Sequence, residues 1–300
     1  MIIRIATRDS QLAIKQSLIV ADALKKIDQE INCELIKTKT KGDILLEHSL
    51  SKIGGKGLFI KEVEEAIIDD RADIAVHSMK DVPSECHDEL EIPCILKRGD
   101  ERDAFVSKKY KTFYDLPKNA NIGTSSHRRK GQILAMRQDI NIIPIRGNIN
   151  SRINKMLNEE VDALILAAAG LKRNHMEMYI NHYFSKNDML PAIAQGAIGV
   201  QVKKSNYKLK ELIAQINDQI TFNNIQAERE FMRIFGANCS TPIAANCVLT
   251  GDRVMLKSGY FFEDGSMQFH SCCEDDKKNF IQLGNECANN MLKYFEHLVR

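Results

Sequence analysis

Hydroxyl and cationic side chains recur where predicted strands end. The four segments are Thr7-Arg8-Asp9-Ser10, Ser78-Met79-Lys80-Asp81, Thr124 to Arg129, and Arg146-Gly147-Asn148 with Arg152. Arginine binds carboxylates and phosphates through two parallel hydrogen bonds, and the N–H groups at a helix N-terminus also attract anions. Each segment alone is typical of a capped helix or a polar loop. Together the four predict a site for a ligand with several negative charges.

The expected positions of the arginines strengthen this interpretation. Ser10 and Ser126 are suitable N-caps, which places Arg128, Arg129 and Arg152 in the first turns of helices. A cation there is disfavoured by a few tenths to about 1 kcal/mol, because the N-terminal end of a helix is positive. A bound anion would offset this cost.

Two further residues have the chemistry of a reactive site. Asp81 stands beside Lys80 and ahead of Pro83. It serves either as a turn or ion-pair residue, or as a carboxylate that stabilises positive charge on a substrate or donates a proton. Cys239 lies in a loop rich in Gly, Asn, Ser and Pro. It is either a small apolar side chain or an exposed thiolate that acts as a nucleophile or attachment point.

Composition restricts the class of protein. The 300 residues are 44% hydrophobic and 27% charged, with a formal net charge of +2, which is typical of a globular protein and argues against a dedicated nucleic-acid binder. Residues 97–152 nevertheless hold 13 Lys and Arg against 5 Asp and Glu. This excess of positive charge is either a solvated basic face or part of a site for an anion.

The sequence also predicts the cellular setting. The longest apolar run, Ala163 to Leu171, is far short of the roughly 20 residues of a membrane-spanning helix. The first ten residues, MIIRIATRDS, lack the apolar core of a secretory signal, so we expect a cytoplasmic protein. The eight cysteines contain no C-x-x-C pair, and we expect reduced thiols without a disulfide framework or a zinc site. No other metal site is expected.

Strand and helix patterns alternate through the first two thirds of the chain. Strands are predicted at Ile2 to Ala6, Asp73 to His77, Ala104 to Ser107, Asn121 to Gly123, Ile142 to Ile145 and Val161 to Ala167. Helices are predicted at Gln11 to Ile27, at Leu58 to Asp70, and after Ser126 and Asn148. This order predicts α/β domains with largely parallel sheets, whose ligand sites lie at the carboxyl ends of the strands. The Gly54 to Gly57 stretch lacks the spacing of a phosphate-binding loop and is interpreted as a flexible loop.

The last quarter of the chain has a different pattern. A helix around Phe222 to Phe235 precedes strands near Ile243 to Leu249, Arg253 to Ser258 and Met267 to Cys273, and a final helix covers Lys277 to Leu298. Glu263-Asp264-Gly265-Ser266 is a turn signal between the last two strands. The pattern predicts a small α+β domain with an antiparallel sheet.

Nine motifs, in this order and spacing, closely resemble the porphobilinogen deaminase family. They are IATRDSQLAI, GGKGLFIKE, DIAVHSMKDVP, RDAFVS, IGTSSHRR, RGN, LAAAGLKR, LPAIAQGAIG and ANCSTPI, and they extend from about Ile3 to Pro242. The C-terminal domain resembles the family only in its general pattern.

The resemblance implies a fold and a reaction. The fold is two α/β domains built like a periplasmic binding protein, with a cleft between them, plus a small C-terminal α+β domain. The implied boundaries are 1–97 with 197–216, 102–191, and 219–300. The reaction joins four porphobilinogen molecules head to tail into hydroxymethylbilane, releasing ammonia at each step, in tetrapyrrole (haem) biosynthesis. A monomer is expected, with porphobilinogen and the growing oligopyrrole as its partners.

The resemblance also implies roles for single residues. The chain grows on a dipyrromethane cofactor fixed by a thioether to Cys239, and Asp81 is the catalytic carboxylate that stabilises the azafulvene cation formed when ammonia leaves. The implied cofactor-binding residues are Lys80, Asp81, Thr124, Ser126, Arg128 and Arg129. The implied substrate-binding residues are Arg8, Ser10, Gln16, Arg146, Arg152, Arg173 and Gln195.

Two other functions fit part of the pattern. A noncatalytic two-lobed anion-binding protein accounts for the arginines but gives no role to Asp81 or Cys239. A nucleic-acid binder built on Arg128, Arg129 and Lys130 lacks aromatic stacking positions in the same region.

Overall fold

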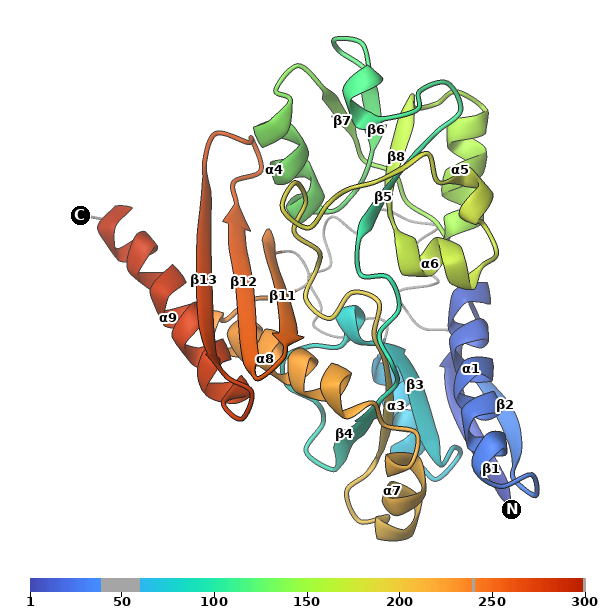
Figure 1. The fold of residues 1–300 in the computed structure, drawn as a ribbon. Coiled ribbons are helices and arrows are strands. Elements are labelled where there is room, and N and C mark those ends of the chain that lie inside the picture. Colours follow the sequence, from blue (N-terminus) through green and yellow to red (C-terminus); the bar gives the residue numbers. More distant parts are fainter. Residues whose placement is uncertain (39–59, 239–240, 299–300) are drawn as a thin grey trace. The chain divides into compact units, whose positions relative to one another are not determined.

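The computed structural model describes residues 1–38, 60–238 and 241–298. The chain forms two compact units, residues 1–99 with 197–222 and residues 100–196 with 223–300 (Figure 1). The predicted glycine-rich loop at 54–57 and the predicted attachment residue Cys239 lie outside the described residues.

The first unit contains a five-stranded sheet in the order β2-β1-β3-β10-β4. Its strands are β1 (Ile2–Arg8), β2 (Asn32–Thr38), β3 (Ile74–Ser78), β4 (Leu90–Ile95) and β10 (Ile198–Lys203). Its helices are α1 (Gln11–Ile27), α3 (Lys61–Ile68), α7 (Tyr207–Ala214) and the short η2 (Met79–Asp81). Strand β1 is parallel to β2 and β3, whereas β10, which enters from a distant part of the sequence, is antiparallel to β3 and β4.

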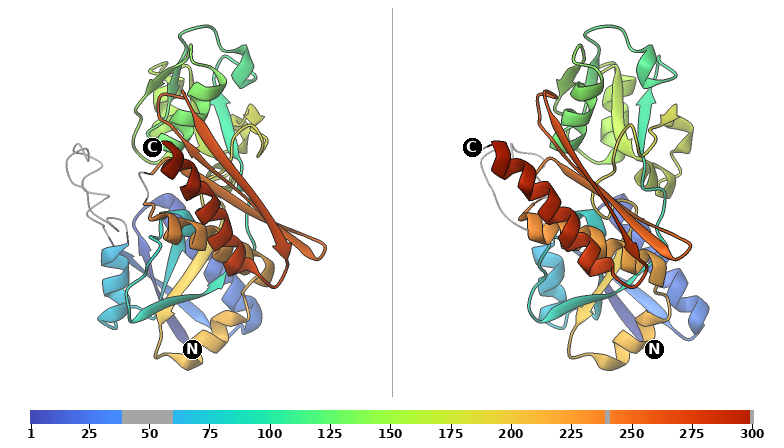
Figure 2. Two further views of the ribbon diagram at one scale, coloured as in Figure 1. Left: turned by 90° about the vertical axis from the view of Figure 1, so that its left-hand side faces the viewer. Right: turned by 60° about the vertical axis from the view of Figure 1, so that its left-hand side comes forward.

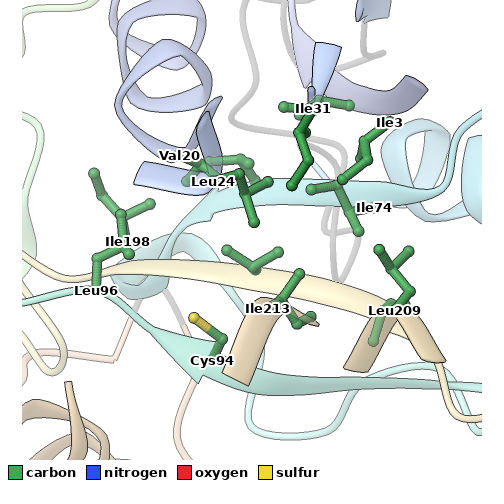
Figure 3. Close-up of a cluster of buried hydrophobic side chains, with 14 residues drawn as sticks. Ile3, Val20, Leu24, Ile31, Ile74, Cys94, Leu96, Ile198, Leu209 and Ile213 are labelled. Atoms are coloured by element: carbon green, nitrogen blue, oxygen red, sulfur yellow. The ribbon is translucent and has the colours of Figure 1, made fainter. Parts of the chain in front are cut away.

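Alternating side chains of this sheet face different helices. Ile3 and Ile5 of β1 join Val20 and Leu24 of α1 in one apolar cluster, to which α7 also contributes (Figure 3). Ala6 faces the other cluster, with α3. Because successive residues of a strand point to opposite faces, this alternation covers both faces of the sheet with helices.

The second unit contains a similar sheet in the order β7-β6-β8-β5-β9. Its strands are β5 (Asp103–Ser107), β6 (Asn121–Gly123), β7 (Asn141–Ile143), β8 (Ala163–Ala167) and β9 (His182–Tyr183). Its helices are α4 (His127–Met136), α5 (Ile149–Leu157), α6 (Ala168–Arg173), η3 (Phe113–Asp115) and η4 (Glu177–Tyr179). Strand β6 is parallel to β7 and β8, and β5 is antiparallel to β8 and β9.

The C-terminal part of the chain, from residue 219 onward, forms a three-stranded antiparallel sheet with two helices. The elements are α8 (Gln219–Phe235), β11 (Ile243–Thr250), β12 (Arg253–Phe261), β13 (Gln268–Asp276) and α9 (Phe280–Leu298). Helix α9 lies along β12 and β13 (Figure 2). Leu256, Leu283 and Cys287 are fully buried there.

The predicted fold class is confirmed, but the expectation of largely parallel sheets is wrong. In each five-stranded sheet two of the four pairings are antiparallel. Three strands of the first unit, β2, β4 and β10, were not predicted. Strand β2 carries polar residues on a partly exposed edge and β4 contains Pro93, which weakens their strand pattern. Strand β10 alternates Ile198, Val200 and Val202 with Gly199, Gln201 and Lys203, and this strand signal was missed.

Helix starts followed the predicted capping. Ser10 accepts a hydrogen bond from the Ala13 N–H, and Ser126 accepts one from the Arg129 N–H. In the part of the chain that the structure describes, no helix is both long and apolar enough to cross a membrane. The same residues contain no cluster of three or more His, Cys, Asp or Glu able to hold a metal ion.

Phe113 and Tyr114 are neighbours in η3 with opposite burial, 0% and 58% exposed. The Phe113 ring makes edge contacts with Phe105 and Phe184 in the core of the second unit. Phe113→Ala is expected to lower the free energy of unfolding by about 3–5 kcal/mol, and Tyr114→Ala by less than about 1 kcal/mol. Urea denaturation of both variants measures the difference, and equal losses would contradict this packing.

Candidate functional site

The first unit brings five of the predicted site residues to one edge of its sheet. Strands β1 and β3 are parallel, so their carboxyl ends share that edge. Arg8 is the last residue of β1, and Ser10 caps the helix that follows. Lys80 and Asp81 lie in η2, directly after β3. Gln16 is 3% exposed and donates from its amide to the Ser78 hydroxyl at 2.8 Å, which links α1 to the end of β3.

The second unit has a corresponding edge that is rich in arginine. Strands β6, β7 and β8 are mutually parallel in direction, so the segments after them lie at the same edge of the sheet. We define the cationic edge as the predicted site residues of this unit together with Asp103, to which Gln195 donates. Its members are Thr124, Ser126, Arg128, Arg129, Arg146, Arg152, Arg173, Gln195 and Asp103. Asp103 belongs to this edge because β5 runs antiparallel to β8 and pairs it with Ala167, the last residue of β8.

Asp103 connects the two arginines at the start of α4, and sequence reasoning did not single it out. Its carboxylate is fully buried and accepts from Arg129 Nε and Nη2 at 3.0 and 2.7 Å. Arg128 Nη1 lies 2.8 Å from its other oxygen. Gln195 Nε2 donates to it at 3.1 Å. A carboxylate at the head of the apolar run Ala104 to Ser107 was the available signal, because a buried charge requires a partner.

The electrostatics of this cluster follow from burial and charge. Burial alone would raise the pKa of Asp103, but the positive charges and hydrogen bonds of Arg128 and Arg129 outweigh it and hold that pKa well below its usual range. Burial lowers the pKa of Arg128, and the Asp103 carboxylate opposes that effect. Part of the counter-charge that the sequence assigned to a bound anion is therefore internal. One carboxylate between two guanidinium groups still leaves a net positive charge.

Two other arginines of the cationic edge, Arg146 and Arg173, lack an acidic partner among the described residues. Arg173 donates to the Gly196 carbonyl, and burial lowers its pKa to about 10. Arg146 has a buried Nη1 atom without a hydrogen-bond partner in the described part of the chain. Arg152 donates from Nε to the Gly147 carbonyl at 2.8 Å. Buried donors without partners are costly, so this edge is suited to an anionic ligand.

Comparison with known proteins identifies the family. The family model described as "Porphobilinogen deaminase, dipyromethane cofactor binding domain" matches residues 3–211, and the model of the porphobilinogen deaminase C-terminal domain matches residues 222–293. The chain belongs to the porphobilinogen deaminase family. The residues predicted to bind cofactor and substrate all fall within the first match, and Cys239 falls within the second.

Curated relatives cover nearly the whole chain. A porphobilinogen deaminase of Campylobacter jejuni subsp. doylei is 46% identical over 308 residues, covering 98% of this chain and 99% of the relative. One of Natranaerobius thermophilus is 43% identical over 298 residues, covering 97% and 95%. Among solved structures, the methionine-binding protein MetQ is similar at a TM-score of 0.47 and 8% identity, covering 75% of this chain and 94% of its own.

Asp103→Asn tests the buried charge cluster. The variant leaves two buried arginines without their carboxylate and is expected to lose about 3–5 kcal/mol of unfolding free energy near neutral pH. The folded-state pKa of Asp103 is lowered. Its stabilisation is therefore present above the usual carboxylate pKa of about 4 and is lost as pH falls towards the lower folded value.

The measurement is the unfolding free energy of wild type and Asp103→Asn at a series of pH values. The difference between them should shrink as pH falls from about 6 to about 3. The exposed Asp22→Asn serves as a control and should stay within about 0.5 kcal/mol of wild type. If the difference between wild type and Asp103→Asn does not depend on pH, Asp103 is not an ionised partner of the arginines.

Proposed function

We propose that this protein condenses porphobilinogen head to tail into hydroxymethylbilane, releasing ammonia at each step, on a dipyrromethane cofactor joined by a thioether to Cys239. The observation that carries the proposal is the excess of arginine over carboxylate at the cationic edge, where the single carboxylate of Asp103 faces both Arg128 and Arg129. Each porphobilinogen unit has an acetate and a propionate group, so cofactor and growing chain present many carboxylates. Membership of the porphobilinogen deaminase family supports the same conclusion.

The residues present fit the cofactor. Arg128 and Arg129 retain net positive charge after pairing with Asp103, and the Thr124 and Ser126 side chains beside them are hydroxyl groups. These four, with Lys80, would bind the cofactor carboxylates. When bound, the dipyrromethane supplies the nucleophilic pyrrole carbon to which porphobilinogen is added.

The remaining arginines would orient the incoming substrate. Arg146 and Arg173 have donors without an acidic partner in the described residues. With Arg8, Ser10, Gln16, Arg152 and Gln195, they would bind the acetate and propionate groups of porphobilinogen. Binding through guanidinium pairs fixes the orientation of a carboxylate as well as its position.

Asp81 is the proposed catalytic residue. It is half-buried in η2, at the carboxyl end of β3. Its carboxylate would contact pyrrole N–H groups and stabilise the positive charge that develops on porphobilinogen as ammonia leaves. Electrostatic stabilisation of developing charge by a fixed group is a large contribution to many enzymatic rates.

We propose that the chain has three domains, one for each sheet. Their bounds are 1–97 with 197–216, 102–191, and 219–300, and the last domain carries Cys239. We propose that the enzyme acts as a monomer in the cytoplasm, with porphobilinogen and the oligopyrrole as partners and no nucleic acid, membrane or metal.

Asp81→Asn should separate cofactor binding from turnover. The variant keeps the shape of the side chain but not its charge, so the protein should still carry the cofactor mass while ammonia release falls by about 10²–10⁴-fold. The matched control is Asp88→Asn, an exposed carboxylate in the same loop region, which should release ammonia at the wild-type rate.

Near-normal ammonia release by Asp81→Asn would remove Asp81 from the mechanism. A noncatalytic anion-binding protein would behave differently, because wild type itself would release no ammonia from porphobilinogen. That outcome would overturn the proposed function as a whole.

A further inference from the structure

The C-terminal domain contacts the helix that carries Arg128 and Arg129. The contact is made by the hairpin tip, residues 262–267, which connects β12 to β13, and by Phe261 at the end of β12 (Figure 1). Both partners belong to the second compact unit.

Two glycines permit the close approach of the hairpin tip and α4. A Cβ atom added to Gly265 would lie 2.5 Å from the Leu134 carbonyl carbon and 2.6 Å from the Ala135 nitrogen. A Cβ atom added to Gly131 would lie 2.7 Å from the Phe262 carbonyl oxygen and 2.9 Å from Phe261 Cβ. These obstacles are largely backbone, which cannot rotate away. The backbones of the hairpin tip and α4 are therefore in direct contact, through one glycine on each element.

Charge pairing adds to this contact at the first turn of α4. Glu263 on the tip lies 2.8 Å from His127 Nδ1 and 3.3 Å from Lys130 Nζ. The hydrogen bond from His127 is the main cause that lowers the pKa of Glu263. The first four residues of α4 are all basic, at the end of a helix where cations are disfavoured. Asp103 pairs with the inner two residues, Arg128 and Arg129, and Glu263 faces the outer two, His127 and Lys130.

Another face of α4 is separated from the C-terminal sheet by open space. A cavity of about 420 Å³ is lined by Gln132 and Met136 of α4 and by Gln268, His270 and Ser271 of β13. Because this space is open, the sheet can fix the position of α4 chiefly through the hairpin tip.

We propose that the hairpin tip of the C-terminal domain is a positioning element for the anion-binding first turn of α4. Gly265 and Glu263 act through Arg128 and Arg129 and do not touch the ligand themselves. The C-terminal domain thus contributes to cofactor binding in addition to supplying Cys239. The inference rests on the proposed function, because the anion is taken to be the carboxylates of the dipyrromethane.

Two alanine substitutions form a matched pair. Gly265 and Gly251 are both in turns of the C-terminal sheet, with positive φ angles of +71° and +61°. Gly265→Ala and Gly251→Ala therefore introduce similar backbone strain. Only at Gly265 does the new methyl group meet α4, because no atom lies within 4 Å of the Cβ position at Gly251.

The first readout is amide hydrogen exchange of residues 127–136, which does not depend on activity. Gly265→Ala should increase exchange in α4 about tenfold, while Gly251→Ala leaves it unchanged. Unchanged exchange in Gly265→Ala, or an equal increase in both variants, would overturn the proposal.

The second readout is the porphobilinogen concentration that half-loads cofactor-free protein, followed by intact mass. Protein made in a host without porphobilinogen is titrated with porphobilinogen. Gly265→Ala should need an about tenfold higher porphobilinogen concentration for half-loading than wild type or Gly251→Ala. If Gly265→Ala exchanges faster in α4 but loads cofactor at the wild-type porphobilinogen concentration, the position of α4 does not affect cofactor binding and the proposal is overturned. If wild type gains no mass, the proposed function fails, while the exchange result still decides whether the tip positions α4.

Glu263→Gln and Gly131→Ala keep the test decisive if Gly265→Ala does not fold. Glu263→Gln removes only the charge contact, and exchange should increase first at Arg129 and Lys130, whose amides donate to Ser126. Gly131→Ala improves intrinsic helix propensity, so faster exchange in α4 can arise only from the lost contact with Phe261 and Phe262. Slower exchange in Gly131→Ala, as propensity alone would give, contradicts the proposal.

Discussion

A carboxylate buried between two arginines determines the arrangement of the cationic edge. Asp103 is fully buried at the start of β5, and it contacts Arg128 and Arg129 of α4 and Gln195 from a second, distant segment of the chain. A buried charge without partners costs several kcal/mol, so these segments must stay together for the chain to fold. The same pairing holds two guanidinium groups in defined positions. Because one negative charge faces two positive ones, the cluster remains attractive to an anion.

Within each unit, the sheet topology gathers functional side chains at one edge of that unit's own sheet. Parallel strands end at a common edge, so short segments after β6, β7 and β8 gather residues that are distant in the sequence. The first unit repeats this arrangement after β1 and β3, where Arg8 and Asp81 lie. The antiparallel strands β5 and β10 have another role. Strand β10 returns the chain to the first sheet, whereas β5 begins the second sheet and places Asp103 at the edge where the parallel strands end.

Much of this arrangement could be predicted from sequence, and the exceptions have physical causes. Local signals were sufficient for α1 and for the caps Ser10 and Ser126, because a cap and its helix are neighbours in the chain. Pairing direction was not predictable from local pattern, since β10 joins its sheet from more than a hundred residues away. Asp103 was missed because the residues that pair with it are also distant in the sequence. Its partners lie in segments that the sequence does not place beside it.

The central claim is that the arginines serve a covalently attached oligopyrrole. The most direct measurement is the intact mass of the denatured protein after exposure to porphobilinogen, followed by a digest that locates any adduct. The account predicts an excess equal to two porphobilinogen units less two ammonia, mapped to Cys239. The exposed thiol of Cys272 serves as an internal control that should stay unmodified. An unchanged mass, or an adduct on Cys272 in place of Cys239, would contradict the account.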